Sequence, residues 1–273
     1  MTTPATNGAT NAATSPYAAP TPVGRFVWHD LMTTDVPRAH AFYTALLGWT
    51  TQVIPMGEFG DYQMVSAGEH GIGGLVPLDP SHGAPSHWIA YVSTPSVDAT
   101  CARIEALGGK TCVPPADIPG VGRFAVVEDP QGAVFSPFTS NDPSPEPPAN
   151  APAGTVAWNE LLTPDPQRAA AFYGDVCGWT HEAMEMPQGT YWLFKRGEQF
   201  AGGMMPMPAD AESRPNWLPY FAVASADAAV ASIASLGGTV MMGPMDIQDW
   251  GRMAVAQDPT GAYFAVLENK QPM

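Results

Sequence analysis

The chain has 273 residues, which is enough for two ordinary domains that each bury a core. Its composition is typical of a globular protein, with 45% hydrophobic and 14% charged residues, and no uncharged apolar run is long enough to span a membrane. The formal net charge of -15 repels phosphate backbones and anionic lipid, so we expect neither nucleic acid nor a membrane as a partner.

The N-terminal residues 1–23 are rich in Ala, Thr, Pro and Asn and lack the basic start and apolar stretch of a signal peptide. We expect them to form a disordered tail. The three cysteines, Cys101, Cys112 and Cys177, fit neither a disulfide framework nor a zinc-binding spacing. A cytoplasmic, reducing environment is therefore expected.

The first predicted element is a strand, Phe26–Thr33. A helix follows, in which Asp35 is the expected cap and Gly48 the expected stop. Three strand-like runs come next: Trp49–Ile54, Tyr62–Ala67 and Ile72–Val76.

The same pattern then restarts with a strand at His87–Ser93 and a second helix that Gly108 ends. Three more strands are predicted: Lys110–Val113, Arg123–Val127 and Ala133–Phe138. A tight Asp-Pro-Gln-Gly turn at 129–132 joins the last two. The order βαβββ therefore occurs twice in this half of the chain.

A proline-rich segment, 140–153, follows and is predicted to be an extended linker. Beyond it the sequence repeats. The segment WHDLMTTDVPRAHAFYTALLGWT, from Trp28, aligns without gaps on WNELLTPDPQRAAAFYGDVCGWT, from Trp158, with 12 of 23 positions identical. We therefore predict two homologous domains, residues 24–139 and 154–268.

This pattern resembles the vicinal oxygen chelate superfamily of glyoxalases, bleomycin-resistance proteins and extradiol dioxygenases. Leu31, Asp35, Phe42-Tyr43 and Leu47-Gly48 carry its opening signature, and its Asp-Pro-x-Gly hairpin occurs in both repeats. The Trp-(His/Asn)-(Asp/Glu)-Leu opening looks most like two-domain actinobacterial glyoxalase-like proteins labelled hydroxylases. The resemblance implies an α+β fold, in which two βαβββ modules per domain form curved, cup-like mixed sheets.

Members of that superfamily hold a divalent metal with side chains on the first, inner, fifth and last strands. Here the ligand positions fall on Trp28 and Trp158, on Gln63 or Met64 and Trp192 or Leu193, on His87 and Asn216, and on Ser136 and Ala265. Only His87 keeps a good donor, and indole offers no lone pair to a metal. We predict no metal and no other cofactor, with a divalent metal as the alternative.

Strand alternation places Asp30 on the cup face with Trp28, and Glu160 with Trp158, whereas His29 turns to the opposite face. The same rule makes each cup apolar and aromatic, which suits a flat, partly apolar ligand. The predicted ligand-binding residues are Trp28, His87, Tyr91, Arg123, Trp158, Asn216, Tyr220 and Arg252.

Asp30 and Glu160 are the candidate catalytic residues. A carboxyl in a dry cup has a raised pKa and can act as a general acid or base, or can pair with a cationic ligand. It can equally accept bonds from nearby Trp, Tyr or backbone donors. Similarly, His87 fits a structural role as well as a ligand contact. Arg123 and Arg252 fit an ion pair that locks a loop as well as an anionic ligand.

These patterns favour a metal-independent protein that sequesters or presents a small aromatic or polycyclic metabolite or drug. The alternative is an enzyme, either a metal-dependent glyoxalase-like lyase or a cofactor-free isomerase or hydroxylase component that uses Asp30 or Glu160. Cups formed within a domain and cups formed between domains are both compatible with the sequence. Because the two fused domains already pair, a monomer or weak homodimer is expected.

Overall fold

A computed structural model of the chain describes residues 22–57, 60–79, 81, 83–142, 151–186, 189–207 and 214–270. Most of the predicted tail and of the predicted linker lies outside these residues. No helix among the described residues is long and apolar enough to cross a membrane.

The first repeat forms one eight-stranded sheet with two helices. Its elements are β1 (Phe26–Thr33), α1 (Val36–Leu47), β2 (Thr50–Pro55), β3 (Asp61–Ala67), β4 (His70–Pro77), β5 (His87–Ser93), α2 (Val97–Ala106), β6 (Lys110–Ile118), β7 (Gly122–Glu128) and β8 (Val134–Ser140). The strand order is β2-β3-β4-β1-β5-β8-β7-β6, and the antiparallel pair β1 and β5 joins the two modules at its centre.

The second repeat forms an equivalent sheet in the order β10-β11-β12-β9-β13-β16-β15-β14. Its elements are β9 (Val156–Thr163), α3 (Pro166–Cys177), β10 (Thr180–Met186), β11 (Gly189–Arg196), β12 (Gln199–Pro206), β13 (Asn216–Ala222), α4 (Ala226–Ser235), β14 (Thr239–Ile247), β15 (Gly251–Gln257) and β16 (Tyr263–Asn269). The predicted duplicated α+β fold with curved mixed sheets is confirmed.

Local sequence signals set several of these boundaries. Asp35 caps α1, because its Oδ1 accepts a bond of 3.1 Å from the backbone N–H of Arg38. Gly48 ends the helix with a φ of 69°, a left-handed conformation that glycine adopts without strain. The Asp129 side chain accepts bonds from the backbone N–H groups of Gln131 and Ala133, which fixes the turn before β8.

One strand extends well beyond its predicted end, whereas the ends of the other predicted strands lie within two residues of their predicted positions. The run Lys110–Val113 extends as β6 to Ile118, through Pro114 and Pro115. Two register shifts against β7 accommodate these residues. Because β6 lies at the edge of the sheet, the N–H that a proline lacks can fall on the side without a neighbouring strand, where no hydrogen bond between strands is lost. The prolines therefore did not end the strand as the sequence suggested.

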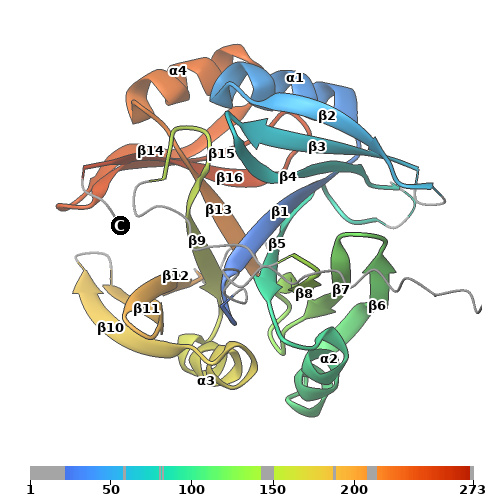
Figure 1. The fold of residues 1–273 in the computed structure, drawn as a ribbon. Helices are drawn as coiled ribbons and strands as arrows, with labels where there is room; N and C mark the ends of the chain where they lie inside the picture. The colour runs from blue at the N-terminus through green and yellow to red at the C-terminus, as the bar shows by residue number, and fades with distance from the viewer. Residues whose placement is uncertain are drawn as a thin grey trace, which may run out of the picture.

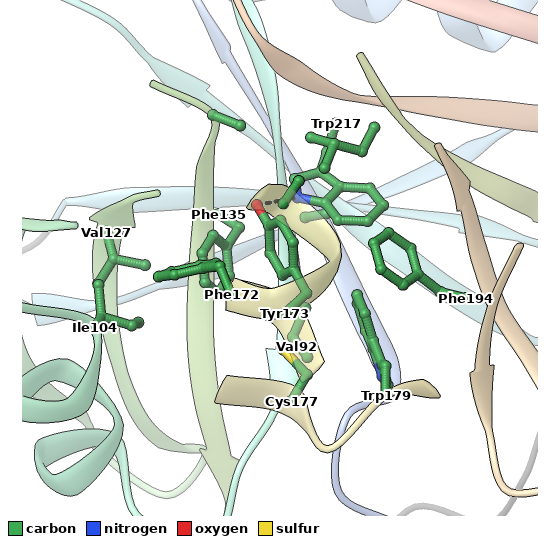
Figure 2. Packing of buried hydrophobic residues seen from close by; sticks show 14 of the residues in the cluster. Val92, Ile104, Val127, Phe135, Phe172, Tyr173, Cys177, Trp179, Phe194 and Trp217 are labelled. Carbon is green, nitrogen blue, oxygen red and sulfur yellow. Dashed lines mark hydrogen bonds between the residues drawn. The ribbon is translucent and has the colours of Figure 1, made fainter. Parts of the chain in front are cut away.

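The two domains pack back to back through their helices (Figure 1). Helix α1 lies beside α4, and α2 lies beside α3, so each pair joins one domain to the other. Phe42 of α1 packs against Phe264 of β16 with ring centroids 5.8 Å apart. Figure 2 shows the interface around α3, where Phe172 and Tyr173 lie beside Phe135 of β8 in the first domain. The buried cores are thus shared between the domains.

The central strands of the two domains meet at His29 and Asn159. The His29 Nε2 lies 2.7 Å from the Asn159 Oδ1, and both side chains are buried. Since His29 faces the other domain, strand alternation turns Trp28 and Asp30 to the opposite, concave face. Each cup therefore forms within one domain and opens away from the domain interface.

Candidate functional site

The floor of the first cup is a hydrogen-bond network around one carboxyl group. The Tyr62 hydroxyl donates to Asp30 Oδ1 at 2.6 Å, and the Tyr91 hydroxyl donates to Oδ2 at 2.8 Å. The Trp28 indole N–H donates to the Tyr62 oxygen at 2.7 Å. Both carboxyl oxygens of Asp30, which is only 6% exposed, are thus occupied.

The second cup repeats this floor with a longer acid. The Tyr220 hydroxyl donates to Glu160 Oε1 at 2.8 Å, and the Trp158 indole N–H donates to the Tyr191 oxygen at 2.9 Å. Tyr191 also hydrogen-bonds to the Glu160 carboxyl and lowers its pKa. The same four chemical groups therefore meet at the floor of both cups.

Two glycines make room for these tyrosines. A Cβ at Gly74 would lie 2.2 Å from the ring of Tyr62, and a Cβ at Gly203 would lie 1.8 Å from the hydroxyl of Tyr191. Both glycines sit on the strand between the tyrosine and the acid. Any side chain there would push the phenol away from the floor.

Burial is the largest influence on the floor carboxyls. It raises the pKa of Asp30 and of Glu160, because the charged form loses its hydration, while the tyrosine hydroxyls act in the opposite direction. Burial also raises the pKa of Tyr62, Tyr191 and Tyr220. The phenols therefore stay protonated at neutral pH and act as donors.

A cavity of about 560 Å³ extends over the second floor. Its apolar wall combines methionines with aromatic rings: Met184, Met186, Met205, Met207, Met242, Met245, Met253, Trp158, Tyr191, Phe200, Tyr220 and Trp250. Glu160 and Asp246 are its acidic residues, and no Lys or Arg is among the described residues that line it. Flexible thioethers adapt their shape to an apolar ligand, and flat rings offer faces and edges for aromatic contacts.

His87 and Asn216 lie at the start of β5 and β13 and bond locally. The His87 Nδ1 donates to the Pro85 carbonyl at 2.7 Å, and the Asn216 Nδ2 donates to the Arg214 carbonyl at 2.8 Å. Asn216 is not among the residues that line the cavity. These contacts match the structural role considered for His87, and a ligand contact of either side chain stays a prediction.

The two predicted arginines form ion pairs. Arg123 donates through Nε and Nη2 to Asp98 and through Nη1 to Asp117, at 2.8 to 2.9 Å. Arg252 makes the equivalent pairs in the second domain. Asp98 lies in the first turn of α2, so Arg123 fastens that helix to the β6–β7 hairpin. This is the ion-pair role expected from the sequence, and binding of an anionic ligand stays a prediction.

Sequence reasoning missed Tyr62 and Tyr191. It considered the inner-strand positions next to these tyrosines as metal ligands. In the structure Leu193, one of those positions, lines the cavity, and Tyr191 supplies a hydroxyl group to the floor. A signal was available, because both repeats carry a tyrosine two residues before Met64 or Leu193, on the same face of the strand.

The metal-ligand positions that the resemblance implies carry other interactions here. The Trp28 and Trp158 indoles donate hydrogen bonds, and the Ser136 hydroxyl donates to the Ala125 carbonyl at 2.6 Å. Across the described part of the chain, no three His, Cys, Asp or Glu side chains cluster closely enough to hold a metal ion.

Comparisons with known proteins agree with the duplicated fold. The profile described as Glyoxalase/Bleomycin resistance protein/Dioxygenase superfamily matches residues 25–136, and that of a Glyoxalase-like domain matches residues 156–267. "Putative glyoxylase CFP32" of Mycobacterium bovis is 40% identical over 247 residues, which are 88% of this chain and 93% of that protein. "Anthracycline biosynthesis protein DnrV" of Streptomyces peucetius is 31% identical over 261 residues, 91% of this chain and 94% of that protein.

Solved structures with the same architecture are more distant in sequence. An extradiol ring-cleaving dioxygenase from B. fuscum is 18% identical with a TM-score of 0.62, over 94% of this chain and 76% of that one. The Mn(II)-bound glyoxalase from Novosphingobium aromaticivorans is 17% identical with a TM-score of 0.56, over 92% of this chain and 83% of that one. These likenesses concern the fold alone.

Proposed function

Because this chain belongs to the glyoxalase, bleomycin resistance protein and dioxygenase superfamily, we propose that it binds a small, flat aromatic molecule in its second cup without using a metal. The observation that carries the proposal is the cavity over Glu160, whose wall is built from methionines and aromatic rings. Its volume of about 560 Å³ lies within the usual range of small-molecule sites.

The chemistry of the floor supports a hydrogen-bonded ligand. Glu160 and the phenols of Tyr191 and Tyr220 are the polar groups at the base of an apolar cavity. They suit one oxygen or nitrogen substituent of an otherwise apolar ring system, which would be held by its edge while its faces contact thioethers and rings. One relative is named an anthracycline biosynthesis protein, and anthracyclines are polycyclic aromatic compounds.

The donor set of the floor does not fit a divalent ion. Each floor offers one carboxyl group, protonated phenols and an indole N–H that points into the network as a donor. The other acid of the second cavity, Asp246, is paired with Arg252. A catalytic divalent metal in a protein needs three or more N, O or S ligands with free lone pairs. We therefore propose that binding is independent of metal.

A fluorescence titration with 1-aminoanthracene, a neutral three-ring probe, tests the proposal. Adjacent residues of β14 supply a matched pair, because Met242 lines the cavity while Met241, equally exposed at 49% against 47%, does not. We expect M242E to weaken binding about tenfold or more and M241E to leave it within about twofold, since only the first places a charge beside the ligand. Equal affinity in both variants would contradict a site in this cup.

Metal independence has its own test. Treatment with EDTA is expected to leave the dissociation constant of 1-aminoanthracene unchanged, and elemental analysis is expected to find no stoichiometric transition metal. Turnover of methylglyoxal with glutathione or mycothiol, restored by an added divalent metal, would instead establish the lyase alternative.

A second candidate function is acid–base chemistry at Glu160. Burial raises the pKa of this carboxyl, and the Tyr220 hydroxyl bonds to it, so the pair could exchange a proton with a ligand atom at the floor. Asp30 occupies the equivalent place in the first cup. Replacing Glu160 with Gln separates the two functions, because it removes the exchangeable proton while keeping the shape of the cup.

We further propose that the protein works in the reducing cytosol as a monomer or weak homodimer. Support comes from the cysteines, which are all unpaired, and from the back-to-back pairing of the two domains within one chain. Size-exclusion chromatography over a range of concentrations tests the oligomeric state, and a stable tetramer would contradict it.

A further inference from the structure

An aromatic bridge crosses one end of the second cup. Phe200 of β12 contacts Trp158 of the floor, with ring centroids 6.2 Å apart, and contacts Trp250 at 6.0 Å. Both contacts are edge-to-face. Since β12 and the β14–β15 hairpin belong to different halves of the sheet, the Phe200–Trp250 contact joins the two halves across the cavity.

The backbone that presents Trp250 is unusual. Gln248, two residues earlier in the same turn, has a φ of 37°, in the left-handed region that residues with a side chain rarely adopt. In the first domain the left-handed residue of the corresponding turn lies one position later, at Gly120 with a φ of 77°, and Pro119 stands at the place of Gln248. A non-glycine residue is therefore held in a strained conformation beside the cavity, which is a common feature of functional turns.

Among the described residues, the first cup has no such bridge. Gly71 stands at the place of Phe200 and Val121 at the place of Trp250, as the alignment of β4 with β12 and of β7 with β15 shows. A Cβ at Gly71 would lie 3.0 Å from the Trp28 ring, so the indole itself covers that position. The two cups share their floors and differ in the rings at this end.

We infer that Phe200 and Trp250 determine the ligand specificity of the second cup, by narrowing one end so that it accepts a flat ring system and rejects a globular one of similar size. The inference rests on the proposed function and names the shape that the site selects. A planar ligand can lie against either ring through stacking or edge contacts, whereas a globular hydrocarbon would have to separate the two rings from each other.

Two alcohols with ten carbons each provide the test: 1-naphthol is flat, and 1-adamantanol is globular. Their affinities are measured by displacement of 1-aminoanthracene, corrected for the affinity of each variant for the probe. The variants F200G and W250V install the first-cup residues singly and together. The control is Y263V, because Tyr263 is an exposed ring of the same domain that does not line the cavity.

We expect the wild-type protein and Y263V to prefer 1-naphthol about tenfold or more, and the double variant to reduce this preference to within about threefold. A preference that survives the double substitution, or that is absent from the wild-type protein, would overturn the inference and leave the binding function intact. Failure of the wild-type protein to bind 1-aminoanthracene would overturn both. If the glycine variant does not fold, F200L with W250L removes the same rings and keeps a side chain on the strand.

Discussion

Acid should reduce the stability that one buried histidine at the domain interface contributes. His29 is 4% exposed and bonds to Asn159 of the other domain. Burial is the main cause that lowers its pKa to about 4, while the bond to Asn159 acts in the opposite direction. The neutral imidazole therefore belongs to the folded protein, and the protonated form is favoured by unfolding.

The sign and size follow from the linkage between protonation and folding. Because the folded pKa lies below the ordinary value of 6.5, the contribution of His29 is fully present above pH 6.5 and declines as the pH falls toward 4. Between pH 7 and pH 5 the expected loss in the free energy of unfolding is about 2 kcal/mol. Asp30 and Glu160 act in the opposite direction, because their folded pKa values are raised.

The variant H29Q isolates this contribution, since glutamine can still bond to Asn159 but does not titrate. Urea unfolding of both proteins at pH 7, 6 and 5, followed by tryptophan fluorescence, gives the two pH profiles. The carboxyl contributions cancel in the difference between them. We expect the wild-type protein to lose about 2 kcal/mol relative to H29Q over this range. Parallel profiles would refute the assignment.

Two further predictions concern the cup floors. G203A places a methyl group against the Tyr191 hydroxyl, so the phenol must move. We expect the free energy of unfolding in urea to fall by about 1–3 kcal/mol and the binding of 1-aminoanthracene to weaken. Unchanged binding would mean that the floor accommodates the methyl group, contrary to this prediction. Y62F removes the donor to Asp30 Oδ1 and the acceptor of the Trp28 indole, so we expect a loss of about 1–3 kcal/mol at pH 7 from buried groups left unpaired; wild-type stability would show that water replaces the hydroxyl.

Much of the fold was readable from the sequence because its signals are local. The alternation of β1, the Asp35 cap and the turn at Asp129 each involve neighbouring residues, and the structure has them where they were predicted. The repeat is visible by direct alignment of the two halves of the sequence. The inward-facing carboxyls Asp30 and Glu160 followed from the same alternation. The extent of β6 was not readable, because its prolines are tolerated only through bulges at a sheet edge, and edge position is a property of the whole sheet.

The rest of the site depends on contacts between distant residues. Tyr62 reaches Asp30 across β4 only because Gly74 leaves space, so the contact requires the strand order and not only the strand. The bridge between Phe200 and Trp250 joins two hairpin ends that no periodicity places together. The location of the cups likewise depends on packing. His29 of β1 packs against the second domain, so the opposite face of β1 lines a cup within the first domain.

The comparison of the two cups separates what the floor does from what the rim does. In both domains the network joins the third, first and fifth strands in chain order through one acid, two phenols and an indole, so it ties these strands together in each cup. A feature that both repeats share serves both cups alike, so a selectivity found in one cup alone must come from features that differ. Phe200 and Trp250 are such features, which is why their loss should change selectivity, whereas loss of the Tyr62 hydroxyl should change stability.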